Sequence, residues 1–138
     1  MKTRYINKSL KDKVKNRFGG KCGYCGLQHE KLQVDHINAF SYFKSTNDET
    51  NLMPACAQCN NMKMSLNLEQ FRYTLQDMVN KARKYSVNFR FAEKYGQIIT
   101  NEHPIQFYFE IIKEDCVCAE INARNCPVCQ NLNEITKD

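Results

Sequence analysis

Two Cys-x-x-Cys pairs bracket a Val-Asp-His-Ile run, and this nesting limits the fold more than any other feature of the chain. The first pair occupies residues 22–25, the Val-Asp-His-Ile run residues 34–37, and the second pair residues 56–59. Four thiolates in two pairs suit a closed tetrahedral zinc site, which leaves no position for water and is therefore structural. The expected zinc ligands are Cys22, Cys25, Cys56 and Cys59.

The composition is that of one globular domain with a modest core. The chain has 138 residues, of which 25% are charged and 42% hydrophobic,. Its apolar runs are too short to span a bilayer, and its N-terminus lacks the apolar core of a signal peptide. Eight cysteines in such a chain indicate metal ligands in a reducing compartment rather than disulfides,. We therefore expect a cytoplasmic protein with no membrane partner.

The charge is distributed unevenly along the chain. Residues 1–33 carry nine Lys and Arg against two acids, whereas residues 96–138 have a net charge of −4. A basic N-terminal third suits a polyanion, because Lys and Arg contacts to phosphate supply most of the non-specific affinity for nucleic acids. A solvated surface with no such partner explains the same charges equally well.

The pattern of apolar residues predicts an α+β fold. Strands are expected at residues 31–37 and 105–111, where polar and apolar side chains alternate,. Residues 38–50 have no period and predict a loop. The apolar stripe within residues 68–82 predicts core packing. Helices are expected at residues 9–18, 60–64, 68–85 and 89–95,.

The order of these motifs resembles the HNH nuclease family, with its ββα-metal fold. Between residues 21 and 63 the chain has Cys-x2-Cys, Asp-His-Ile, Asn-Leu, Cys-x2-Cys and Asn-x2-Lys. Each piece alone is common, and their order and spacing together carry the resemblance. The family's third signature position is often His, and here it is Asn60, so the chain resembles an HNN variant of bacterial, phage or prophage type.

The resemblance implies an α+β architecture in which a ββα-metal core is braced by the four-cysteine zinc site, with flanking helices and a C-terminal strand. It divides the chain into four expected parts. These are a basic N-terminal helix at residues 1–20, the core at 21–64, a helical and strand extension at 65–112, and a Cys-rich tail at 113–138.

The resemblance also implies metal-dependent hydrolysis of DNA phosphodiester bonds, by nicking or by cutting both strands. His36 is expected to be the general base, because imidazole is mostly neutral at cytoplasmic pH. Asp35 and Asn60 are expected to hold one Mg²⁺ or Mn²⁺ ion, since oxygen ligands suit a hard cation. Asn51 is expected to stitch the loop across the hairpin and orient His36. Lys63, one helical turn after Asn60, is expected to touch phosphate or stabilise the charged transition state.

The adjacent positions of Asp35 and His36 conflict with a single site on a regular strand, where neighbouring side chains point to opposite faces. Both can serve one phosphate only if the strand ends or bulges there, or if the DNA straddles its edge.

The C-terminal tail carries four more thiols in the pattern Cys-x-Cys-x7-Cys-x2-Cys. This spacing favours a second zinc site with the ligands Cys116, Cys118, Cys126 and Cys129. Free or redox-active thiols, and disulfides formed on oxidation, are the alternatives. The acidic balance of the tail argues against wrapping DNA and favours a clip for the fold or a contact with a protein partner; a homodimer is also compatible.

Two other functions are compatible with the sequence. One is a non-catalytic, zinc-stabilised DNA-binding or adaptor module, which a broken Asp-His pair or a missing downstream Asn would favour; neither occurs. The other is a regulatory subunit of a phage or defence complex, and only the acidic, Cys-rich tail suggests it.

Overall fold

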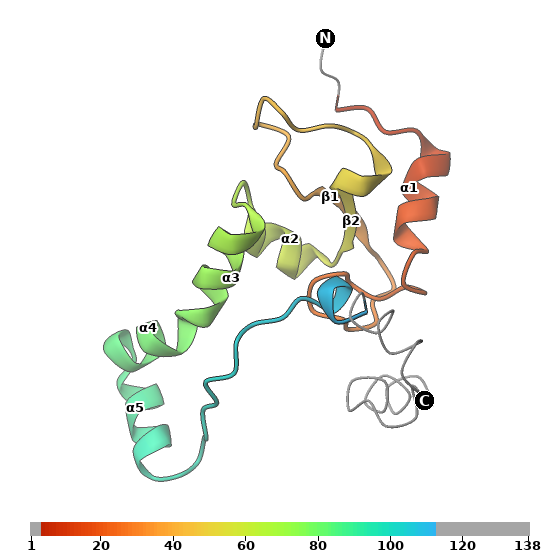
Figure 1. The fold of residues 1–138 in the computed structure, drawn as a ribbon. Helices are drawn as coiled ribbons and strands as arrows, with labels where there is room; N and C mark the ends of the chain where they lie inside the picture. Colours follow the sequence, from red (N-terminus) through yellow and green to blue (C-terminus); the bar gives the residue numbers. More distant parts are fainter. Residues whose placement is uncertain (1–3, 113–138) are drawn as a thin grey trace, which may run out of the picture.

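A computed structural model describes residues 4–112 (Figure 1). In Figure 1, α1 lies on one side of the two strands, and α3, α4 and α5 extend away on the other. No helix in this described range is long and apolar enough to cross a membrane. The elements in chain order are α1 (Lys8–Lys15), β1 (Gln33–His36), a short 3₁₀ turn η1 (Glu49–Asn51), β2 (Leu52–Ala55), α2 (Ala57–Lys63), α3 (Leu68–Gln76), α4 (Met78–Tyr85) and α5 (Val87–Lys94).

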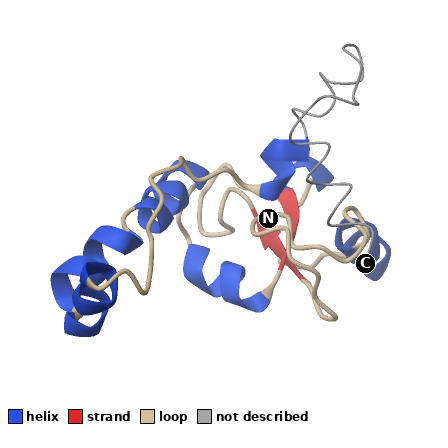
Figure 2. Ribbon diagram, turned by 90° about the horizontal axis from the view of Figure 1, so that it is seen from below, coloured by secondary structure: helices blue, strands red, loops and turns tan. Residues whose placement is uncertain are grey.

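The two strands form an antiparallel hairpin, and α2 follows β2 directly. The register places Asp35 opposite Met53 and His36 opposite Leu52. Within the described residues β1 pairs with β2 alone, so the other edge of β1 is open. Figure 2 shows this small sheet among the helices. The α+β class and the ββα core expected from the sequence are confirmed.

The hairpin packs against different neighbours on its two faces. On one face, Leu52 and Val34 meet α1, where Val14 is 0% exposed and Ile6 completes the cluster. Successive strand residues point to opposite faces, so Met53, next to Leu52, faces the other way. There it packs against the first cysteine knuckle, the turn at residues 22–25. The buried cluster on that side comprises Cys22, Tyr24, Leu32, Met53, Ala55, Cys56, Phe71 and Phe107.

The helix expected over residues 68–85 is two helices, α3 and α4, which meet at Asp77. Core packing holds only the first of them. Phe71 of α3 is 1% exposed, whereas α4 buries no residue. The apolar stripe therefore contributes to the core through α3. No buried side chain of α4 fixes its direction relative to α3.

The strand expected at residues 105–111 is absent, and residues 108–112 are helical instead. Phe107 is buried, with its ring centroid 5.5 Å from that of Tyr24 and 5.2 Å from that of Phe71. The next two backbone N–H groups donate to carbonyl oxygens of the first cysteine knuckle, which is a turn and not a strand. The alternation of aromatic residues in this segment thus reflects packing against the knuckle and not membership of a β-sheet.

Candidate metal centre and active site

The four cysteines of the two Cys-x-x-Cys pairs converge on one point. Their sulfur atoms all lie within 4.8 Å of one another. Sulfurs around a tetrahedral zinc with Zn–S near ~2.3 Å are roughly 3.8 Å apart, a spacing that lies within this limit. The cluster fits zinc, as the sequence predicts. The second expected set, Cys116, Cys118, Cys126 and Cys129, lies outside the described residues.

Hydrogen bonding within the cluster favours the thiolate form of one sulfur. The hydrogen bond with the Cys59 side chain is the largest influence on Cys22 and lowers the pKa of its thiol to about 4. The same interaction raises the pKa of Cys59. Metal binding requires deprotonated cysteines, so a cation at this point would replace the shared protons.

Local backbone structure brings the two pairs together. In the first knuckle the N–H of Cys22 donates to the carbonyl of Leu27 at 3.0 Å. Gly23 lies so close to β2 that a Cβ there would overlap the Met53 side chain and lie 3.1 Å from the carbonyl oxygen of Pro54, so a larger residue would require Met53 to shift. In the second knuckle Cys56 is the N-cap of α2, with its sulfur accepting from the N–H of Cys59 at 3.4 Å,.

A cleft of about 550 Å³ runs along the open edge of β1. Five consecutive residues, 32–36, line it, together with Asn60 of α2 and residues of α1. Asp35, His36 and Asn60 therefore meet in one cleft. Asp35 and His36 point to opposite faces of β1. Both can still border one cleft, because the cleft follows the edge of the strand and β1 ends at His36.

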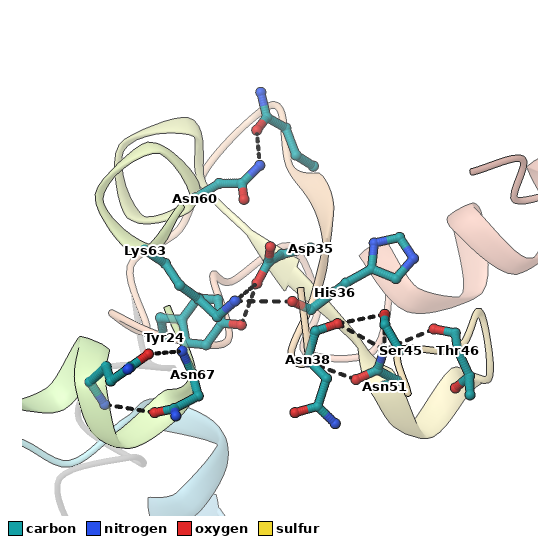
Figure 3. Close-up of polar contacts among 12 residues, drawn as sticks. Tyr24, Asp35, His36, Asn38, Ser45, Thr46, Asn51, Asn60, Lys63 and Asn67 are labelled. Atoms are coloured by element: carbon teal, nitrogen blue, oxygen red, sulfur yellow. Dashed lines mark hydrogen bonds and ion pairs between the residues drawn. The ribbon is translucent and has the colours of Figure 1, made fainter. Parts of the chain in front are cut away.

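Asp35 is held from beneath by two buried groups (Figure 3). Its Oδ2 accepts a hydrogen bond from the Tyr24 hydroxyl at 2.6 Å and lies 3.1 Å from Nζ of Lys63. Burial, and then the nearby Asp35 charge, raise the pKa of Tyr24, which keeps the hydroxyl protonated as a donor. In Figure 3 the other carboxylate oxygen points away from both groups.

The position of Lys63 does not fit the expected contact with phosphate. Its side chain is 0% exposed, and besides Asp35 it donates to the backbone carbonyl of His36 at 3.0 Å. The last turn of α2 directs this lysine back beneath the strand, where the buried carboxylate compensates its charge. Lys63 thus braces the site from behind.

The His36 ring is oriented by the loop that follows it. Its Nε2 lies 2.8 Å from Oδ1 of Asn47, and the Asn47 amide nitrogen donates to the carbonyl of Tyr5 at 3.2 Å. Because Oδ1 of Asn47 can only accept, neutral His36 carries its proton on Nε2 and its lone pair on Nδ1. The ring also packs edge-on against Phe40, with centroids 5.7 Å apart.

Asn51 is buried and ties the two ends of the 38–50 loop together. Its Oδ1 accepts from the N–H of Asn38 at 2.8 Å, and its Nδ2 donates to the carbonyl of Thr46 at 2.8 Å. Its own carbonyl accepts from the N–H of Ile37, the residue after the strand. The loop that carries Asn47 is thereby fixed relative to the end of β1.

Asn60 faces the cleft from the middle of α2. Its Nδ2 donates to Oε1 of Gln33 at 2.7 Å, so the amide oxygen is the group left to accept or to coordinate,. No sequence pattern indicated a role for Gln33, Tyr24 or Asn47. Tyr24 lies at a variable position of a Cys-x-x-Cys pair, and Asn47 is one polar residue of an aperiodic loop, so only the fold gives them a role.

A hairpin followed by a helix, with Asp, His and Asn around a cleft and a four-cysteine cluster beneath it, defines the ββα-metal class. Residues 22–65 match the family described as HNH endonuclease, and this segment is an HNH endonuclease domain. The SPbeta prophage-derived protein YoqL of Bacillus subtilis (strain 168), named as a putative HNH endonuclease, is 34% identical over 68 residues.

That similarity covers 43% of this chain and 30% of YoqL. No solved structure matches the chain. Helix α1 and most of the chain after α2 lie outside the family match.

Proposed function

We propose that the chain is a metal-dependent endonuclease that hydrolyses phosphodiester bonds of DNA. The observation that carries this proposal is the meeting of Asp35, His36 and Asn60, from a strand and a helix, in one open cleft. They provide an imidazole base and two oxygen donors within the segment that matches the HNH family. Metal-assisted hydrolysis of a phosphodiester uses a base that activates water and ligands that hold the cation at the phosphate.

His36 is the proposed general base. The hydrogen bond from its Nε2–H to Asn47 leaves Nδ1 to take a proton from an attacking water,. The water oxygen then bonds to phosphorus, the bond from phosphorus to the leaving sugar oxygen breaks, and that oxygen takes a proton from solvent. Asn51 acts indirectly, because it fixes the loop on which Asn47 lies.

Asp35 and Asn60 are the proposed ligands of a divalent cation. Carboxylate and amide oxygens are the donors that Mg²⁺ and Mn²⁺ prefer, and both residues line the cleft with an oxygen outside the hydrogen bonds described above. A bound cation would polarise the scissile phosphate and stabilise the leaving oxygen. Tyr24 and Lys63 hold Oδ2 of Asp35, which leaves Oδ1 for the cleft.

The four-cysteine cluster is proposed to bind a structural zinc ion. Four thiolate ligands close the coordination shell, so the ion takes no part in hydrolysis. It links the knuckle that carries Tyr24 to the N-terminus of α2. Zinc would therefore stabilise the two elements that position Asp35 and Asn60.

Supercoiled plasmid incubated with the full chain and Mg²⁺ tests this function. Omission of Mg²⁺ should stop cleavage, and His36→Ala should slow it at least ~10²-fold, as expected for a lost general base. Zinc content and melting temperature should not change. His103→Ala is the control, since His103 is exposed and does not line the cleft.

A parental cleavage rate in His36→Ala would place the base elsewhere. A parent chain that binds DNA but never cleaves it under these conditions would favour the non-catalytic module instead. Open-circle and linear products would separate nicking from double-strand cutting.

A further inference from the structure

Cations of α1 line the same cleft as the proposed catalytic residues. Lys11 and Lys15 contribute to its wall, together with Arg4 just before the helix. The two lysines are four residues apart and so are neighbours on one face of α1. All three lie outside the segment that matches the HNH family.

The remaining cations near the end of α1 have a different task. Lys13 pairs with Glu49 at 3.0 Å. Arg17, just after the helix, donates to the backbone carbonyls of Leu52 at 2.7 Å and Glu49 at 3.0 Å. These contacts attach α1 to the hairpin. These two side chains are thus bound to the fold, whereas Arg4, Lys11 and Lys15 line the cleft.

The cleft has more positive charge than its own residues compensate. Asp35 is the one carboxylate among the described residues that line it, and Asp35 already pairs with buried Lys63. Within residues 4–112, no ion pair involves Arg4, Lys11 or Lys15. A concave surface with such an excess of cations attracts a polyanion.

The register of the hairpin places His36 on the same side as these cations. His36 and Leu52 are paired on the strand face that meets α1. The Arg4 guanidinium lies 4.7 Å from the centre of the Phe40 ring, which packs against the His36 ring. A phosphate held by this wall would therefore lie beside the imidazole.

We propose that Lys11, Lys15 and Arg4 bind the phosphodiester backbone of the strand that crosses His36 and hold it along the open edge of β1. This inference rests on the proposed function for the nature of the polyanion. Contacts of this kind read no sequence. They give α1 a part in substrate binding that the HNH segment alone does not contain.

The test compares two variants of the full chain that lose the same charge. Lys11→Gln/Lys15→Gln removes cations of the cleft. Lys13→Gln/Lys81→Gln removes one paired lysine of α1 and one exposed lysine of α4, neither of which lines the cleft. Binding to a short fluorescent duplex DNA is measured by anisotropy over a range of salt, without added Mg²⁺ and without chelator, so that zinc stays bound.

The cleft variant should bind about eightfold more weakly per lost contact at about 0.1 M salt, since each contact contributes a slope of about 0.9 in log K against log salt. Its salt slope should fall by about 2, whereas the control should keep the parental slope. Melting temperature and zinc content should match the parent in both variants.

Equal losses of DNA affinity in the two variants would mean that only the net charge of the chain matters, which would overturn the inference. So would a parent chain that binds no DNA. A cleft-specific loss of binding in a chain that never cleaves DNA would uphold the inference and defeat the proposed hydrolysis, so the two failures are distinguishable.

Discussion

The two carboxylate oxygens of Asp35 have different surroundings. Oδ2 is engaged by the Tyr24 hydroxyl and by Lys63, both of which are buried. A carboxylate without such partners rotates readily, because its terminal torsion is broad. The pairing instead selects one oxygen for the cleft and compensates the charge of the buried carboxylate. We infer that Tyr24 and Lys63 are positioning residues for the proposed cation.

Tyr24→Phe tests this positioning role. The change removes one hydroxyl and keeps the ring, which packs against Phe71 and Phe107. The Mg²⁺ concentration for half-maximal cleavage should rise about tenfold, as expected for roughly 1.4 kcal/mol of lost hydrogen bonding. The rate at saturating Mg²⁺ should change less. Tyr73→Phe is the control, since Tyr73 is 71% exposed. A lower melting temperature with an unchanged Mg²⁺ dependence would make Tyr24 purely structural.

The secondary-structure elements that the sequence predicted best are those whose apolar pattern lies within one short segment. Helix α1 and the strand that ends at His36 follow from local periodicity, and the paired cysteines indicated that the two knuckles meet. The break at Asp77 and the helix at residues 108–112 depend on packing against distant residues, which no local period reports. Phe107 illustrates this, since its partners come from the first knuckle and α3.

The same distinction applies to the candidate site. Asp35, His36 and Asn60 were predicted from order and spacing, and the fold brings them to one cleft. The contact of Asn47 with His36 spans a loop without any period, and the burial of Lys63 depends on how α2 packs under the strand. Such roles arise from tertiary structure alone.

Cys56→Ser separates the two functions of the second knuckle. Cys56 is both a proposed zinc ligand and the N-cap of α2. Serine is itself a favourable N-cap, so the helix start is kept and the thiolate ligand is lost. The chain should lose about one zinc ion and melt about 10 °C lower or more, because the free energy of structural zinc binding is folding free energy. Elemental analysis and calorimetry measure both, and unchanged zinc content would contradict the site.

On the scale of the whole molecule, the chain leaves the core at α4 and returns to it beyond α5. Neither α4 nor α5 buries a residue. The returning segment is attached by Arg72, which donates to the carbonyl of Ile105 at 2.6 Å and pairs with Glu110 at 2.6 Å. The Arg72 guanidinium also lies 4.8 Å from the ring centre of Phe107. A segment outside the HNH match therefore completes the packing around the first knuckle.

Phe107→Ala tests whether this return stabilises the core. Phe107 is 1% exposed, and loss of a buried Phe side chain typically costs about 3–5 kcal/mol,. The melting temperature should therefore fall by roughly 10 °C or more, with zinc released at a lower temperature because the ring borders Tyr24 of the knuckle. Phe91→Ala on α5 removes the same side chain at a position that is 52% exposed, and should change stability by about 0.5 kcal/mol or less. Calorimetry with a zinc-release dye measures both quantities. Equal effects of the two substitutions would mean that the returning segment contributes no more to the core than the exposed helix does.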